Sequence, residues 1–269
     1  MRKAFVISGL AIFMTLLQLP SAFGCSSFFD IKCQLGDKFE YLNALGRLAP
    51  ASPQTGSDEI TIDRIDLLPV RQYLTAEEIP PSGAGAYGIV AFQAKSTATS
   101  RDKMLMVCES FVAFFPKNEL IPSSIPVSDR MITVWPLDDP ISEQAKSDDC
   151  DFLIDHYELV ASETAMADAR RQKAKFDGQG PFLIGWSPSN SRGKKDKLVL
   201  VVDLSADNTQ QNINLEFLFW KTMIVQNPAA WRGGFSLEQL RTSIHNFADQ
   251  YGSEVVATIK IFGTTGHQD

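Results

Sequence analysis

Two apolar runs, Phe182-Leu183-Ile184-Gly185-Trp186 and Leu198-Val199-Leu200-Val201-Val202-Asp203-Leu204, decide the fold. Each is rich in β-branched or aromatic residues, which favours β-strands. The loop between them is polar and carries Pro188, Gly193 and several basic residues. Two strands joined by one such loop predict a β-hairpin. The second run is apolar at almost every position, which is typical of a central strand covered on both faces.

The elements around this hairpin alternate between strands and helices. The spacing predicts a helix over 236–251, with an apolar stripe and an S-x-x-Q capping box formed by Ser236 and Gln239. A second helix is expected over 152–175, where alanine is frequent and the last turns are basic. Further strands are expected at 60–65, 87–94, 131–135 and 255–262.

Two apolar segments are ambiguous by pattern alone. Residues 104–115 fit either a buried helix or a long strand, and possible caps at Ser100 and Asp102 favour the helix. Residues 214–225 also fit either a helix or a long strand. The sum of these elements predicts an α+β or α/β fold, with a mixed β-sheet packed by several helices.

The N-terminus has the three parts of a secretory signal peptide. Arg2 and Lys3 precede an apolar run over 4–19, and small residues at Ala22 and Gly24 suit cleavage after Gly24. This run of about 16 residues is shorter than the roughly 20 that a membrane-spanning helix needs, although an uncleaved anchor remains an alternative. We therefore expect an exported protein, either periplasmic or extracellular.

Cleavage divides the chain into four expected parts. These are a signal peptide (1–24), a lead-in and linker rich in Pro, Gly and Ser (25–58), one α+β domain (59–263) and a disordered tail (264–269). Cleavage would leave Cys25 as the first residue, so a lipid anchor on this cysteine is a second alternative. The large Phe23 fits a lipoprotein signal poorly.

All four cysteines lie beyond the predicted signal, and an even number in an exported chain favours disulfides. Of the three possible pairings, we predict Cys25–Cys33 and Cys108–Cys150; buried free thiols are the alternative. Lipidation of Cys25 would leave one of the other three unpaired.

Composition excludes several classes of function. The net charge of −7 would become −9 without Arg2 and Lys3, and such an acidic chain disfavours general nucleic-acid binding. The sequence contains no GxGxxG, Walker, HExxH or CxxC motif, so we expect no nucleotide, zinc or haem cofactor.

Ser187, Asp203 and His245 follow the order of an α/β-hydrolase triad. Such a triad needs a base beside the serine and an acid that orients the base. The segment Gly185-Trp186-Ser187-Pro188-Ser189 departs from the G-x-S-x-G elbow, and Pro188 lacks the N–H that an oxyanion hole needs. The alternative is a hairpin edge, a strand-ending aspartate and a surface histidine.

Acidic residues suggest two weaker sites. The carboxylates near His156, within 148–155, could bind a cation, but acids at a helix start more often cap the helix. Asp138 and Asp139 could contribute to a glycosidase pair, whose separation the sequence does not give. We predict no metal site.

Two basic groups stand out in this acidic chain. Arg170 and Arg171 lie near the end of the predicted helix, while Arg192, Lys194 and Lys195 lie in the hairpin loop. Together they could bind an anionic partner such as an acidic protein, a polysaccharide or a membrane surface. The alternative is a solvated helix end and a solubilising loop.

These observations favour an exported, non-enzymatic envelope protein that serves as an interaction or assembly module. An exported hydrolase of the serine or acid/base type and a periplasmic small-ligand binder are the alternatives.

Overall fold

The computed structural model describes residues 67–252 and 258–263 of the chain. These residues belong to the second of two units into which the chain divides, Thr61–Asp269. The expected signal peptide, linker, Cys25–Cys33 pair, strand at 60–65 and C-terminal tail lie outside the described residues.

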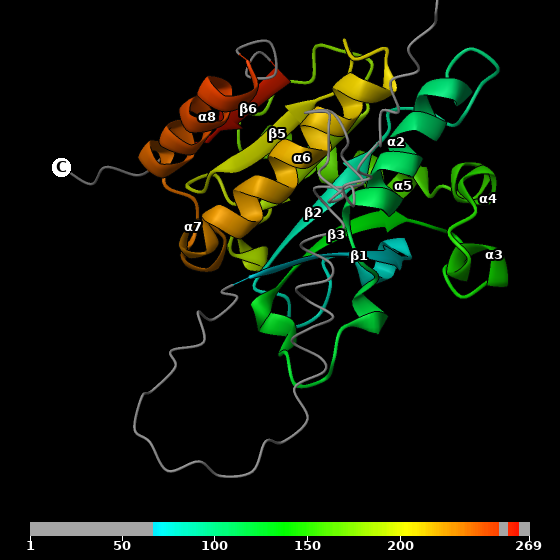
Figure 1. Ribbon diagram of the computed structural model, residues 1–269, viewed down its shortest axis with the longest axis horizontal. Coiled ribbons are helices and arrows are strands. Elements are labelled where there is room, and N and C mark those ends of the chain that lie inside the picture. Colours follow the sequence, from blue (N-terminus) through cyan, green and yellow to red (C-terminus); the bar gives the residue numbers. More distant parts are fainter. Residues whose placement is uncertain (1–66, 253–257, 264–269) are drawn as a thin grey trace, which may run out of the picture. The chain divides into compact units, whose positions relative to one another are not determined.

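The described part is an α+β fold built on a mixed six-stranded sheet, as predicted (Figure 1). The strand order is β1-β3-β2-β4-β5-β6. Strands β1, β3 and β2 are parallel, whereas β4, β5 and β6 each run antiparallel to their neighbours. The bounds are β1 Leu68–Leu74, β2 Ala86–Ala91, β3 Arg130–Pro136, β4 Phe182–Trp186, β5 Val199–Asp203 and β6 Ile259–Phe262.

Helices cover both faces of this sheet. Seven α-helices occur in the described residues, with bounds α2 Arg101–Phe114, α3 Glu143–Lys146, α4 Cys150–Asp155, α5 Leu159–Arg171, α6 Gln210–Gln226, α7 Pro228–Gly233 and α8 Leu237–Tyr251. Helix α5 packs its alanines on the face that carries Ile89, Ile132 and Ile184. On the other face, α8, α6 and α2 lie next to one another across the sheet (Figure 1).

A pair of glycines lets α6 approach the sheet closely. Gly88 and Gly185 are partners across β2 and β4, and Trp220 of α6 lies directly over them. A Cβ atom at Gly185 would lie 2.7 Å from the Trp220 ring. The Trp220 indole also donates a hydrogen bond of 3.1 Å to Thr133 of β3. The glycines therefore form the recess that receives the largest side chain of this helix.

The predicted hairpin and the helix favoured over 104–115 are confirmed as β4–β5 and α2. Residues 214–225, for which a helix and a long strand were both expected alternatives, lie in helix α6. The expected helix over 236–251 is α8, but the Ser236 side chain makes no capping hydrogen bond, so the predicted capping box is wrong. The described end of the expected closing strand forms β6.

The single helix predicted over 152–175 is wrong, because the chain breaks into α4 and α5 around Tyr157. The Tyr157 ring is buried, and its hydroxyl donates to the Val90 carbonyl and accepts from the Phe92 amide. Burying this side chain at the end of β2 requires the backbone to leave the helical path. The helix α5 that follows also ends earlier than predicted, at Arg171.

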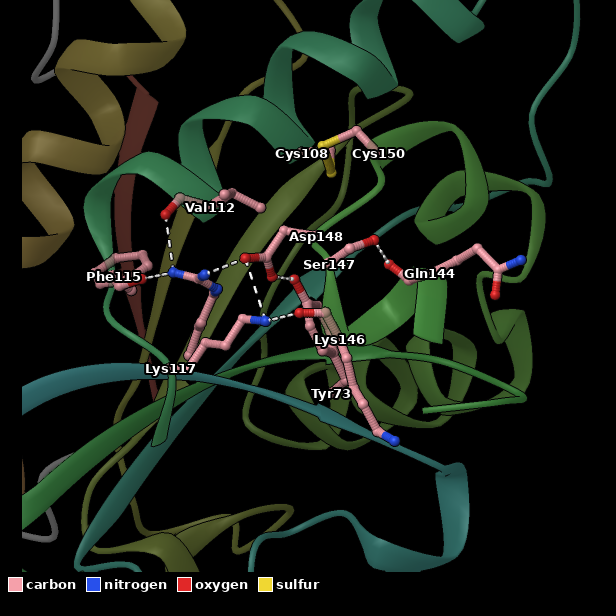
Figure 2. Close-up of polar contacts among 11 residues, drawn as sticks. Tyr73, Cys108, Val112, Phe115, Lys117, Gln144, Lys146, Ser147, Asp148 and Cys150 are labelled. Atoms are coloured by element: carbon pink, nitrogen blue, oxygen red, sulfur yellow. Dashed lines mark hydrogen bonds and ion pairs between the residues drawn. A yellow bond between two sulfur atoms is a disulfide. The ribbon is translucent and has the colours of Figure 1, made fainter. Parts of the chain in front are cut away.

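A disulfide and a buried ion cluster fasten α4 to the rest of the domain (Figure 2). Cys108 of α2 is bonded to Cys150 of α4, as predicted. Two residues before Cys150, the Asp148 carboxylate accepts from Arg71 at 2.7 Å and from Tyr73 at 2.6 Å, both on β1. Lys117 lies 3.3 Å from the same carboxylate.

Arg71 also binds the C-terminal end of α2, because its guanidinium donates to the carbonyls of Val112 and Phe115 (Figure 2). Carbonyls at the end of a helix lack partners within the helix, so a cation there satisfies them. The cluster therefore joins β1, α2 and the start of α4. Burial, with the hydrogen bond to Asp148, raises the pKa of Tyr73 far above its usual value, so this hydroxyl keeps its proton.

Candidate functional site

The three residues of the suggested triad are not brought together. Antiparallel pairing places Asp203 opposite Phe182, at the far end of the hairpin from Ser187. Five residues of strand separate them, or about 16 Å. The Ser187 hydroxyl is buried and hydrogen-bonded to the carbonyls of Ala230 and Trp231. Asp203 pairs with Lys260 at 3.0 Å, and His245 lies exposed on α8.

The acidic residues around His156 are engaged with protein groups. Asp149 caps α4 by accepting from the amides of Asp151 and Phe152. Arg101 pairs with both Asp151 and Asp155. His156 lies 2.9 Å from Asp138, and both side chains are about half exposed. In the part of the chain that the structure describes, no group of three or more His, Cys, Asp or Glu residues could hold a metal ion.

The five predicted basic residues separate into two sets. Arg170 points away toward Phe176, 5.3 Å from its ring, while Lys194 and Lys195 are exposed on the loop after β4. Arg171 and Arg192, by contrast, both pair with the carboxylate of Asp168. Each guanidinium uses a different carboxylate oxygen, so one aspartate holds two arginines from separate elements side by side.

Arg171 and Arg192 line one end of a groove of about 460 Å³, which we call the arginine groove. Its remaining lining residues are Ala76, Ile79, Pro80, Ala161, Thr164, Asp168, Ser189 and Asn190. Positions 161, 164, 168 and 171 recur at helical spacing, so a single face of α5 forms the floor. This face extends over about 15 Å. The groove is therefore a shallow channel with an apolar end and a cationic end.

Arg192 is fixed by contacts on several sides. Besides its ion pair with Asp168, it donates a hydrogen bond of 3.1 Å to the Tyr87 hydroxyl. Its guanidinium lies 5.5 Å from the centre of the Trp186 ring. Only 11% of its side chain is exposed, compared with 58% for Arg171. Burial raises the pKa of Tyr87 to about 12, so Tyr87 stays neutral beside the arginine.

The loop that carries Arg192 is held by the buried side chain of Gln172, at the end of α5. Its amide oxygen accepts from Trp186 at 2.6 Å and from the Gly193 amide at 3.3 Å, while its nitrogen donates to the Lys197 carbonyl at 3.0 Å. Gly193 has φ of 70°, and a Cβ atom there would lie 3.3 Å from the Asp168 carboxylate. Glycine at this position lets the loop pass close to the ion pair.

A second groove lies at the carboxyl end of β2, and we call it the β2 groove. Its volume is about 600 Å³. Its lining comes from residues 92–95, Thr97, Thr99, Ser100, the first turn of α2, residues 179–181, Ser205 and Asn208. Lys103 donates to the Ser205 carbonyl at 2.6 Å. Burial lowers the pKa of Lys103, against the opposing effect of two nearby aspartates.

Sequence reasoning missed Asp168, Tyr87 and Gln172 as parts of the arginine groove. Asp168 precedes Arg171 by three residues on a helix, a spacing that favours an ion pair, and this was the one signal available. The other two contacts join residues far apart in the sequence.

Comparison of the chain with protein-family models, curated proteins and solved structures finds no match. Among the described residues, no helix is both long and apolar enough to span a bilayer.

Proposed function

We propose that this protein is an exported, non-enzymatic interaction module of the cell envelope, which binds an acidic partner through the arginine groove. The observation that carries the proposal is the pairing of Arg171 and Arg192 on Asp168 at one end of this groove. A guanidinium held in a fixed orientation forms directed, often bidentate hydrogen bonds with carboxylates and phosphates.

The groove is suited to binding rather than to catalysis. Both Asp168 oxygens already accept from arginines, and Tyr87 holds its proton firmly. A general base must lie within hydrogen-bond reach of the substrate proton and needs a pKa near the working pH. Asp168 is only 9% exposed and is covered by the two arginines. Ser187 lies outside this groove, and its hydroxyl is buried against the carbonyls of Ala230 and Trp231. We therefore expect no labelling of Ser187 by a fluorophosphonate probe, whereas stoichiometric labelling would favour the hydrolase alternative.

Charge supports an acidic partner. The chain has 32 acidic and 25 basic residues, so a site with two arginines and one aspartate departs from the overall charge. Its net charge of +1 lies partly below the surface, where screening by salt is weaker than for an exposed lysine. An acidic ligand would be drawn here rather than to the exposed acidic surface.

The test measures binding of three fluorescent anionic probes: poly-glutamate, polygalacturonate and vesicles containing phosphatidylglycerol. Arg171→Gln removes one groove cation that is largely exposed, so the fold should survive. Arg170→Gln is the matched control, because it removes the same charge from the adjacent residue outside the groove. We expect at least a fivefold loss of affinity in Arg171→Gln and less than a twofold loss in Arg170→Gln. Equal losses in the two variants would contradict the proposal.

A second candidate function, small-ligand binding, is favoured by the position of the β2 groove. The groove lies outside the carboxyl end of β2 and beside the first turn of α2. Ligands of open α/β sheets commonly bind outside the carboxyl ends of strands. The volume is also in the range of small-molecule sites. A thermal-shift screen with metabolites would detect such a ligand. The function would be assigned to the β2 groove if a hit were lost in Lys103→Met and kept in Arg171→Gln.

A further inference from the structure

We propose that the arginine groove recognises the C-terminal carboxylate of a partner polypeptide whose last side chain is apolar. This inference rests on the proposed function and names the class of ligand. Three features of the groove lead to it: its net charge, the donors that stay available, and the apolar surface next to them.

The net charge matches a monoanion. Arg171 and Arg192 contribute two positive charges and Asp168 one negative charge, so one carboxylate would neutralise the site. A phosphate dianion would leave an excess negative charge beside the buried Asp168, whose side chain is only 9% exposed. Uncompensated charge in a partly dehydrated site is unfavourable, so the groove favours a carboxylate over a phosphate monoester.

The available donors suit a planar carboxylate. Arg192 uses Nε for Asp168 and Nη1 for Tyr87, and Arg171 uses Nη2 for Asp168. Within residues 67–252 and 258–263, Nη2 of Arg192 and Nη1 of Arg171 have no hydrogen-bond partner. Two guanidiniums with free N–H groups next to each other can bind both oxygens of a carboxylate.

The rest of the groove argues for an apolar group next to that carboxylate. Four of its residues, Ala76, Ile79, Pro80 and Ala161, offer only carbon atoms from their side chains. An acidic sugar presents hydroxyl groups beside its carboxylate, and these would lose hydrogen bonds with water against such a surface. The terminal residue of a protein combines a carboxylate with a side chain. Thr164 on the floor of the groove and Asn190 on the loop after β4 can form hydrogen bonds with its backbone.

The size of the groove fits this ligand. A volume of about 460 Å³ is in the range of small-molecule pockets. It accommodates the end of a chain rather than a long polymer segment. Binding would therefore depend on the last few residues of the partner and on a free terminus.

The test uses an array of hexapeptides in which the last residue is varied, each made with a free carboxylate and with a C-terminal amide. We expect signal from free acids that end in apolar residues, at least a tenfold weaker signal from their amides, and loss of the signal in Arg171→Gln but not in Arg170→Gln. Equal binding of acids and amides would overturn the inference.

Poly-glutamate binding separates failure of this inference from failure of the proposed function. If poly-glutamate binding depends on Arg171 while the array shows no preference for a free terminus, the groove binds acidic side chains and only this inference fails. If neither probe depends on Arg171, both proposals fail. Arg192→Lys is the second variant, because it keeps the positive charge but removes the planar set of guanidinium donors. It should weaken binding of peptides with a free C-terminal carboxylate about fivefold or more.

Discussion

Cleavage of the Cys108–Cys150 disulfide is expected to lower the free energy of unfolding by about 4 kcal/mol. The two cysteines are 42 residues apart in the sequence. A cross-link of that span restricts the unfolded chain, and the chain-entropy relation gives about 4 kcal/mol at 25 °C. The disulfide also fastens α4 beside the Arg71–Asp148 pair, so its loss should loosen that cluster (Figure 2).

Urea unfolding of the oxidised protein, the reduced protein and Cys108→Ala measures this loss. Reduction changes side-chain volume very little, so agreement between the reduced protein and the variant would assign the effect to the cross-link. Hydrogen exchange should show faster exchange of the α4 amides after reduction, while exchange in β4 and β5 changes only with global stability. A loss of less than about 1 kcal/mol in the reduced protein would mean that the cross-link does not stabilise the fold by restricting the unfolded chain.

Three further predictions concern packing, the groove loop and pH. Gly185→Ala should lower the free energy of unfolding, measured in urea, by about 1–3 kcal/mol, because the added Cβ would overlap the tryptophan of α6. Gly233→Ala is the control and should leave stability unchanged, because no atom lies within 4 Å of its added Cβ. Gln172→Leu leaves the Trp186 N–H unpaired in the core, so it should lower the free energy of unfolding by about 1–3 kcal/mol. It should also weaken binding at the arginine groove, because Gln172 holds the loop that carries Arg192. Unchanged affinity in a folded Gln172→Leu protein would show that the loop does not need this side chain. Burial raises the pKa of Glu216 to about 8. Between pH 4.5 and 8 the folded protein therefore keeps a proton that the unfolded chain releases, so the free energy of unfolding should fall as the pH rises through this range. Glu216→Gln should flatten this part of the stability profile; an unchanged slope would rule out Glu216 as its source.

Local pattern predicted the elements whose burial is simple. The β4–β5 hairpin consists of continuous apolar runs, and both strands are almost fully buried, so sequence and environment agree. Helix α8 has one apolar stripe, and Leu240, Ile244 and Phe247 are its buried residues. In these elements the positions of the apolar residues in the sequence predict the buried face correctly.

Strand β1 was missed because its sequence does not look like a buried strand. It contains Pro69 and the charged Arg71, and β1 is an edge strand of the described sheet, where proline is tolerated. The charge of the buried Arg71 is compensated by the Asp148 carboxylate and by a carbonyl at the end of α2. Such compensation comes from residues far along the chain, which periodicity cannot show.

The candidate site was predicted in part. Basic residues in an acidic chain identified Arg171 and Arg192, but the same pattern also included Arg170, Lys194 and Lys195, which do not line the groove. The difference depends on which side of α5 each residue occupies and on the path of one loop. That path is set by Gln172, whose contacts no local pattern encodes.

The most direct measurement of the central claim compares poly-glutamate binding by the Arg171→Gln and Arg170→Gln proteins at low and moderate salt. The two variants have the same net charge, but the missing cation lies in the arginine groove in only one of them. We expect the dissociation constant of Arg171→Gln to be at least fivefold larger than that of Arg170→Gln at both salt concentrations. Identical affinities would mean that general surface charge, and not the arginine groove, determines binding.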